Sequence, residues 1–218
     1  MDIITLVSTL ALLSLAPFLL MLTTSFIKFT VVMSLIRSAL GTQQIPPNPV
    51  ILGLAVALTI HVMAPVAVDM HRIWVNHTGE PVTVSGTTDL HRLLDRVSDT
   101  SAPLHRFLLR HAHARDVEMF ESFSAANMKR TIRASESCSF DVLIPAFVVS
   151  ELKESFEIGF LIFLPFVMVD MIVANVLQAM GMMMLSPTTI SLPFKLLLFV
   201  LSDGWHVLVE SLLRGYML

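Results

Sequence analysis

Charged side chains are missing from two long stretches of this 218-residue sequence. Ile3 to Ile27 is a run of 25 residues without a charge, and in the 20 residues from Pro49 to Val68 the only titratable group is His61. A helix of about 20 apolar residues is long enough to cross the roughly 30 Å hydrocarbon core of a bilayer. Each stretch is therefore expected to form an apolar helix able to cross a membrane.

The charges that are present divide the chain into three parts. Residues 1–68 contain three charged residues, residues 69–141 contain nineteen and residues 142–218 contain nine. With 55% hydrophobic residues, 14% charged residues and a mean hydropathy of +0.76, the chain is too apolar for a free-standing soluble domain. We expect an all-α fold in which apolar helical hairpins at 1–68 and 142–218 flank a small hydrophilic helical domain at 69–141.

The second hairpin is predicted from two weaker apolar runs. Ile158 to Met184 is interrupted by Asp170, and Leu196 to Leu213 contains three titratable side chains. The connection at 28–48 contains two basic residues, and the next short connection ends at a third. Because basic residues gather in cytoplasmic loops, both hairpin turns are expected inside, with the two termini and the hydrophilic domain outside.

Apolar residues recur at helical spacing in the hydrophilic part. Three stripes predict three short amphipathic helices: Leu90, Leu93, Leu94 and Val97 in the first, Leu104, Phe107 and Leu108 in the second, and Val117, Phe120 and Phe123 in the third. Ser101 and Pro103 suit the cap and first turn of the second helix.

Several function classes lack support in the sequence. A net charge of −3 provides no basic surface for nucleic acid. Nucleotide-binding, nucleophile-elbow and metalloprotease motifs are missing, so we predict no catalytic residue, no cofactor and no enzymatic activity. His111 and His113 on a helix would point about 200° apart, so no metal site is predicted. Cys138 is the only cysteine and cannot form an internal disulfide.

Asp170 is the most informative ionisable residue, because a carboxylate in an apolar helix is costly unless it faces protein or water. Helical spacing places it on one face with Gln178 and Gly181. One interpretation is a proton relay or pore lining, and the other is an interhelical hydrogen bond that fixes packing; the second is favoured. Asp203 and Glu210 predict a similar polar seam on the last helix.

A short charged stretch that starts at Ser150 is expected to begin the third apolar helix. Within it, Lys153 and Glu157 are an i, i+4 pair of opposite charge, and Glu151 precedes them. A solvated entry turn is the favoured interpretation. The alternative is charge pairing between neighbouring copies, since charges buried at a subunit contact would be selective.

Three consecutive methionines, Met182, Met183 and Met184, follow Gly181. Methionine is unbranched and adaptable, so thioethers from several subunits could close a lumen as a hydrophobic gate. The alternative is ordinary packing in a core or against lipid, which composition alone favours.

Short blocks of residues in both apolar parts form an ordered series. The blocks are Ala39-Leu40-Gly41-Thr42, Pro46-Pro47-Asn48, Leu143-Ile144-Pro145, Ser150-Glu151-Leu152-Lys153, Pro165-Phe166, Asp170, Gly181-Met182-Met183-Met184, Leu192-Pro193-Phe194-Lys195 and Asp203-Gly204-Trp205. In sequence and spacing they resemble the FliP/SctR family of type III secretion export-gate proteins. The hydrophilic part matches that family only in length and character.

The resemblance implies an all-helical subunit of the bacterial inner membrane, whose assembled helices are raised toward the periplasm. It implies a homo-pentamer that joins SctS/FliQ-type and SctT/FliR-type proteins in an entry pore for unfolded secreted substrates, near SctU/FlhB-type and SctV/FlhA-type proteins and membrane lipid. Met182, Met183 and Met184 would form the gasket of that pore, which reverses the preference for core packing.

Further expectations follow for mechanism and for the polar residues. Transport would be passive in this subunit, because no nucleotide-binding motif is present. The residues expected at a subunit interface or polar seam are Glu151, Lys153, Glu157, Asp170, Gln178 and Asp203. The alternative function is a proton-coupled transporter or ion-channel subunit centred on Asp170.

Overall fold

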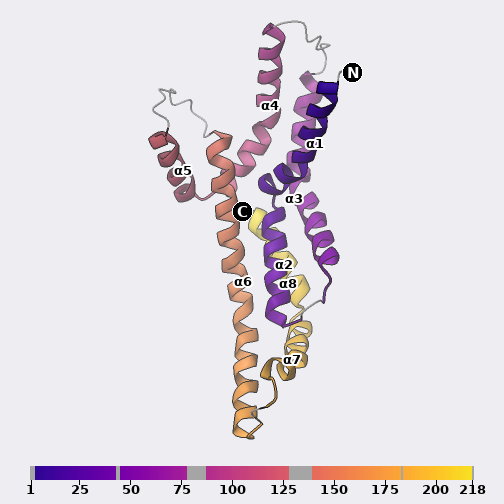
Figure 1. The fold of residues 1–218 in the computed structure, drawn as a ribbon, viewed down its shortest axis with the longest axis vertical. Helices are drawn as coiled ribbons and strands as arrows, with labels where there is room; N and C mark the ends of the chain where they lie inside the picture. Colours follow the sequence, from indigo (N-terminus) through magenta and orange to yellow (C-terminus); the bar gives the residue numbers. More distant parts are fainter. Residues whose placement is uncertain (1–2, 43–44, 78–86, 128–138, 183, 218) are drawn as a thin grey trace. The chain divides into compact units, whose positions relative to one another are not determined.

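The computed structural model describes residues 3–42, 45–77, 87–127, 139–182 and 184–217, and every regular element in these ranges is an α-helix (Figure 1). In chain order the helices are α1 (Ile3–Thr23), α2 (Phe26–Leu40), α3 (Asn48–His77), α4 (Thr87–His111), α5 (Ala114–Asn127), α6 (Phe140–Ala179), α7 (Pro187–Leu201) and α8 (Gly204–Met217). The all-α fold predicted from the sequence is confirmed.

Two of the described helices, α3 and α6, are long and apolar enough to cross a membrane. The number rises to as many as four if α1 with α2, and α7 with α8, each count as one broken span. The chain divides into two compact units, one made of Met1–Ser25 and Ile60–Glu151 and the other of Phe26–Thr59 and Leu152–Leu218. We call these unit 1 and unit 2.

The core of unit 1 lies between α4 and the first turns of α6. Phe107 and Leu108 are buried on α4, and Leu143 and Phe147 are fully buried on α6. The ring centroids of Phe107 and Phe147 are 5.9 Å apart. Because this apolar stripe starts well before the charged stretch at Ser150, α6 begins at Phe140, and the prediction of a helix start at Ser150 is wrong.

The hydrophilic part contains two described helices where the sequence predicted three. Pro103, predicted in the first turn of a second helix, lies buried inside α4. Proline removes one helical hydrogen bond, yet Phe107 and Leu108 continue the apolar face past it, and their burial favours one continuous helix. A turn follows α4, and the backbone N–H of His113 there donates to Ser150 Oγ at 2.9 Å.

The core of unit 2 is built around α2. Its buried stripe has the spacing of an amphipathic helix and consists of Phe29, Val32, Met33, Ile36, Ala39 and Leu40. This pattern explains why residues 28–40 are helical, although the sequence interpretation assigned them to a connection. On α8 the buried residues Leu208, Leu212 and Tyr216 recur every four positions, and α7 contacts both α2 and α8.

The first apolar run of the sequence is not one helix. The expected span Ile3 to Ile27 is interrupted, because α1 ends at Thr23 and α2 begins at Phe26. The hydroxyls of Thr23 and Thr24 donate to backbone carbonyls four residues earlier, at 2.7 and 2.6 Å. Such side-chain bonds compete with the helical ladder and favour a break.

The last apolar run is also broken, between α7 and α8, which form an angle of 60°. Asp203 adopts a left-handed backbone conformation there, with φ of 49°. Aspartate tolerates this conformation better than most residues. A Cβ at the following Gly204 would overlap the Phe199 ring, so glycine allows that ring to pack against the turn between α7 and α8. Asp203 therefore lies in a turn, and its predicted placement on the last helix is wrong.

Candidate functional site

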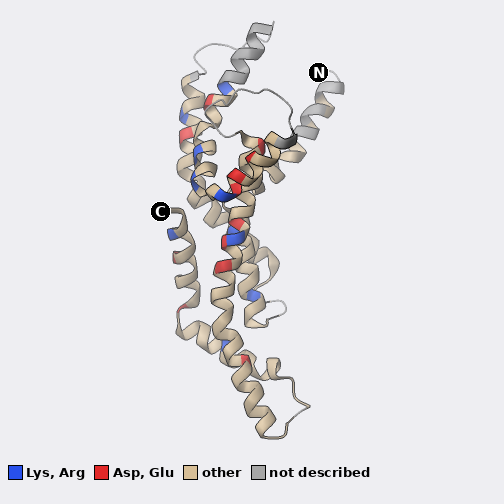
Figure 2. Cartoon of the chain, turned by 90° about the vertical axis from the view of Figure 1, so that its left-hand side faces the viewer, with Lys and Arg blue, Asp and Glu red and all other residues tan. Residues whose placement is uncertain are grey.

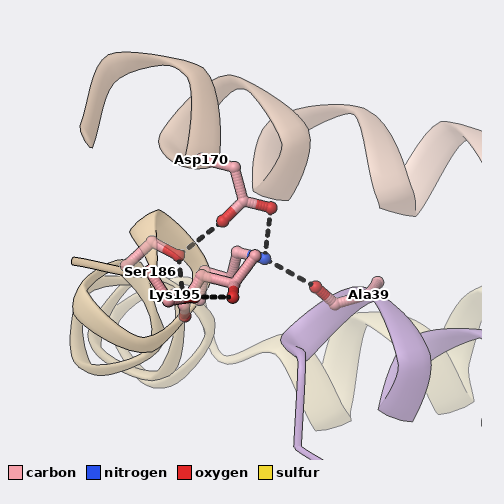
Figure 3. A network of polar contacts seen from close by, with 6 residues as sticks. Ala39, Asp170, Ser186 and Lys195 are labelled. Carbon is pink, nitrogen blue, oxygen red and sulfur yellow. Dashed lines mark hydrogen bonds and ion pairs between the residues drawn. The ribbon is translucent and has the colours of Figure 1, made fainter. Parts of the chain in front are cut away.

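Asp170 is part of a polar network inside unit 2 (Figure 3). Lys195 Nζ donates to Asp170 Oδ2 at 2.6 Å and to the backbone carbonyl of Ala39 at 3.2 Å. Ser191 Oγ donates to the other carboxylate oxygen, Asp170 Oδ1, at 2.5 Å. The side chain of Lys195 is only 5% exposed. One lysine therefore joins α6, α7 and the end of α2.

Local structure brings these groups together. Ser191 and Lys195 are four residues apart on α7, so they share one face of that helix. Ala39 lies in the last turn of α2, where backbone carbonyls have no helical partner and carry partial negative charge. Gly41 ends this helix with φ of 75°, and a Cβ there would lie 3.9 Å from Lys195 Nζ. The positive φ is what favours glycine here, since a contact of 3.9 Å would leave room for the lysine.

The network continues toward the start of α7. Ser191 Oγ also lies 3.1 Å from the backbone carbonyl of Thr188, and the hydroxyls of Ser186 and Thr188 are 2.8 Å apart. Ser186 immediately precedes α7. Buried charges are tolerated when they are paired and hydrogen-bonded, and both oxygens of Asp170 have partners from this chain. The arrangement links α6, α7 and the end of α2 through one ion pair and its hydrogen bonds.

A second buried lysine was missed by the sequence analysis, which placed Lys28 in a connection. Its side chain is 2% exposed, and Nζ lies 2.6 Å from Glu154 Oε2 on α6. The same Nζ stands 4.3 Å from the ring centroid of Tyr216 on α8, and the Phe29 and Tyr216 rings are 5.7 Å apart. The sequence signal was a single charged residue among apolar ones, and the same kind of signal drew attention to Asp170.

The methionine loop, defined here as Met182–Met184, begins directly after α6. Gly181 has φ of 73°, and the N–H of Met182 donates to the carbonyl of Leu177 at 2.9 Å, a bond typical of a glycine-terminated helix. Met182 is 43% exposed and Met184 is 100% exposed. Met183 lies outside the described residues. Thioethers are thus presented at the surface of the subunit.

The other predicted site residues are dispersed along the chain. Glu151 is buried on α6, whereas Lys153, Glu157, Gln178 and Asp203 are exposed. In the described part of the chain no ion pair joins Lys153 to Glu157. Their assignment to a subunit interface stays a prediction.

Unit 2 leaves extensive apolar surface uncovered. A groove of about 460 Å³ lies among α2, α6, α7 and α8, and a second of about 450 Å³ lies between α6 and α7. Figure 2 shows few charged residues on the last turns of α6 and on α7. No group of three histidine, cysteine, aspartate or glutamate residues that could hold a metal ion occurs among the described residues.

Comparison with known proteins places these features in a family. The sequence model of the FliP family matches residues 9–212. Yop proteins translocation protein R of Yersinia pestis is 46% identical over 217 residues, which cover 99% of this chain and 97% of that protein. Virulence protein YscR of Salmonella typhimurium is 40% identical over 212 residues, 97% of this chain and 95% of that protein. Flagellar biosynthetic protein FliP of Bacillus subtilis is 39% identical over 203 residues, 93% of this chain and 87% of that protein.

Proposed function

Because the chain belongs to the FliP family, we propose that it is a core subunit of a type III secretion export gate. At the coarser level it is a subunit of a secretion apparatus in the inner membrane. The finer proposal is that it forms, with partner subunits, the entry pore for unfolded protein substrates. The observation that carries the proposal is the exposed apolar surface of α6 together with the exposed methionines that follow this helix in the sequence.

The exposed surface of α6 favours assembly with other subunits. Its large apolar residues that are more than half exposed include Phe156, Phe160, Leu161, Met168, Met171, Ile172 and Val176. Surface of this kind must be covered by lipid or protein. The apolar helices of a single chain are too few to enclose a conduit wide enough for a polypeptide, so copies must surround an axis. We propose a homo-pentamer joined by SctS/FliQ-type and SctT/FliR-type proteins, with SctU/FlhB-type and SctV/FlhA-type proteins nearby.

The methionine loop is proposed as the seal of this pore. A hydrophobic constriction excludes water and ions, and flexible thioethers adapt to a moving polypeptide. In support, Met182 and Met184 are exposed between the glycine-terminated end of α6 and the start of α7, so this chain does not bury them. Transport is passive in this subunit.

Replacing Met182, Met183 and Met184 by alanine tests the seal. The variant is expected to assemble normally but to conduct small ions when the co-expressed particle is reconstituted in a planar bilayer. A matched variant, Met217→Ala, changes a methionine that is 71% exposed on α8 and should stay closed. Unchanged conductance in the triple variant would refute the gasket.

Contacts between copies, as a polar seam, are the proposed role of the exposed residues Lys153, Glu157, Gln178 and Asp203, whereas Glu151 is buried in its own chain. For Asp170, the two partners in its own chain support a packing role. Asp170→Asn separates packing from proton transport: a packing residue loses assembly, whereas a proton carrier would lose turnover in an intact particle.

The hydrophilic domain at 69–141 is proposed to face the periplasm, between apolar parts at 1–68 and 142–218. Glu121 is exposed on α5 and suits a labelling test. In a Cys138→Ser background, Glu121→Cys should react with a membrane-impermeant maleimide added to intact spheroplasts. Labelling only after lysis would place the domain in the cytoplasm.

A further inference from the structure

We propose that Met182 and Met184 are a site of reversible oxidation, at which a peroxide turns the closed gasket into a leaking one. The inference rests on the proposed function, because it concerns the same loop. It adds a chemical modification and a consequence that neither the fold nor the family match contains.

Exposure separates these thioethers from the methionine of the unit 2 core. Met184 is 100% exposed and Met182 is 43% exposed, whereas Met33 on α2 is 1% exposed. Oxidation of methionine requires contact between sulfur and the oxidant, so exposed thioethers react and Met33 is protected. Met168, Met171 and Met180 are also exposed, so exposure alone does not single out the loop; the proposed position of Met182 and Met184 at the constriction is what links their oxidation to conductance.

Two helix ends flank the described methionines of the loop. Gly181, with φ of 73°, follows the last turn of α6, and α7 begins at Pro187, three residues after Met184. The backbone N–H of Met182 donates to the carbonyl of Leu177. This bond keeps the backbone of Met182 beside the end of α6.

The reaction is a two-electron oxygen transfer. A lone pair of the thioether sulfur attacks one oxygen of hydrogen peroxide, the O–O bond breaks, an S–O bond forms, and a proton shift releases water. The sulfur loses two electrons and the peroxide gains them. The product, methionine sulfoxide, is reduced back by methionine sulfoxide reductases at the expense of a dithiol.

The product has the opposite effect on water from the thioether. A thioether is apolar and only a weak acceptor, whereas a sulfoxide is polar and accepts strong hydrogen bonds. Gates that close by dewetting depend on an apolar constriction, so sulfoxides from several copies would hydrate it. Peroxide is therefore expected to open an ion leak without any substrate.

The test uses the assembled particle in a planar bilayer, with hydrogen peroxide as the probe. Conductance of the wild type should rise about tenfold or more as the constriction becomes wet, and a methionine sulfoxide reductase with its dithiol should reverse the rise. Met182→Leu/Met184→Leu keeps the volume and apolar character, so it should remain closed in peroxide. Met217→Leu, which removes an equally oxidisable methionine from α8, should respond like the wild type.

Mass spectrometry of the same samples locates the oxygen atoms. Sulfoxide at Met182 and Met184, with Met33 unmodified, is the expected result. The inference is overturned if the double leucine variant leaks like the wild type, if Met217→Leu abolishes the response, or if sulfoxide at the loop leaves conductance unchanged. A triple alanine variant that leaks, together with a wild type whose conductance peroxide does not raise, would refute this inference and leave the proposed gasket standing.

Discussion

The two halves of α6 differ in composition and in surroundings. In the first half Leu143, Phe147 and Ser150 are completely buried by their own chain. In the second half Phe160 and Leu161 are 64% and 66% exposed. The first half contains five charged residues and the second half contains one, so the more apolar half is the one that its own chain leaves more exposed. The first half acts as a core, and the second has no comparable cover within the chain.

The largest expected effect comes from truncating a buried side chain in the first half of α6. Phe147→Ala removes a fully buried ring and should lower the free energy of unfolding by about 3–5 kcal/mol. Phe160→Ala is the matched change in the exposed half and should leave subunit stability nearly unchanged while it weakens assembly. Thermal unfolding in mild detergent, read beside particle mass, measures both effects. Equal losses of stability at the two positions would contradict the proposed difference between the two halves of α6.

Removing one partner of the network in Figure 3 should have the next largest effect. Lys195→Met leaves the Asp170 carboxylate without its cation and should cost about 3 kcal/mol, at the low end for a broken buried pair because Asp170 is 29% exposed. The double variant Lys195→Met/Asp170→Leu removes both charges and should recover most of the stability. A double variant as unstable as the single one would show that the pairing contributes little.

The sequence predicted the apolar helices but not these pairings. Long apolar runs were sufficient to identify α3 and most of α6, and one interrupting carboxylate drew attention to Asp170, which lies in the network. The partner Lys195 is 25 residues away, and the partner of Lys28 is 126 residues away, so neither pair follows from helical spacing. Sequence patterns of this length report only one face of a helix, not the element that covers it.

Some helix boundaries were predicted wrongly for a related reason. The runs ending at Ile27 and Leu213 were interpreted as continuous because hydropathy does not register a backbone break. Threonine hydroxyls at the first break and a left-handed Asp203 at the second determine where the helices end. In the hydrophilic part, α4 continues past Pro103 because its apolar face is buried against α6. The helix propensity of proline alone would disfavour this.

A smaller effect is expected from the hydroxyl that joins α6 to the turn before α5. Ser150 Oγ accepts from the His113 backbone and donates to Asp116 Oδ2 at 2.7 Å. Ser150→Ala should lower the free energy of unfolding by about 1 kcal/mol, since two half-buried polar groups lose a partner. Ser150→Thr, which keeps a hydroxyl, is the control. If both variants unfold like the wild type, the hydrogen bonds of Ser150 contribute little to the stability of the subunit.

The smallest effect is predicted at an exposed ion pair on α8. Arg214 and Glu210 are separated by one turn, with side chains 73% and 45% exposed. Glu210→Gln should change the free energy of unfolding by less than about 0.5 kcal/mol, because water screens the pair. A larger loss, measured in the same detergent, would mean that this surface is covered in the particle.

The central claim is that sister copies cover the exposed half of α6 around an axis, and the mass of the intact particle tests it most directly. Native mass spectrometry of the chain co-expressed with its SctS/FliQ-type and SctT/FliR-type partners should find five copies of the 24.2 kDa subunit in each particle. A particle that contains a single copy of this chain would contradict the account.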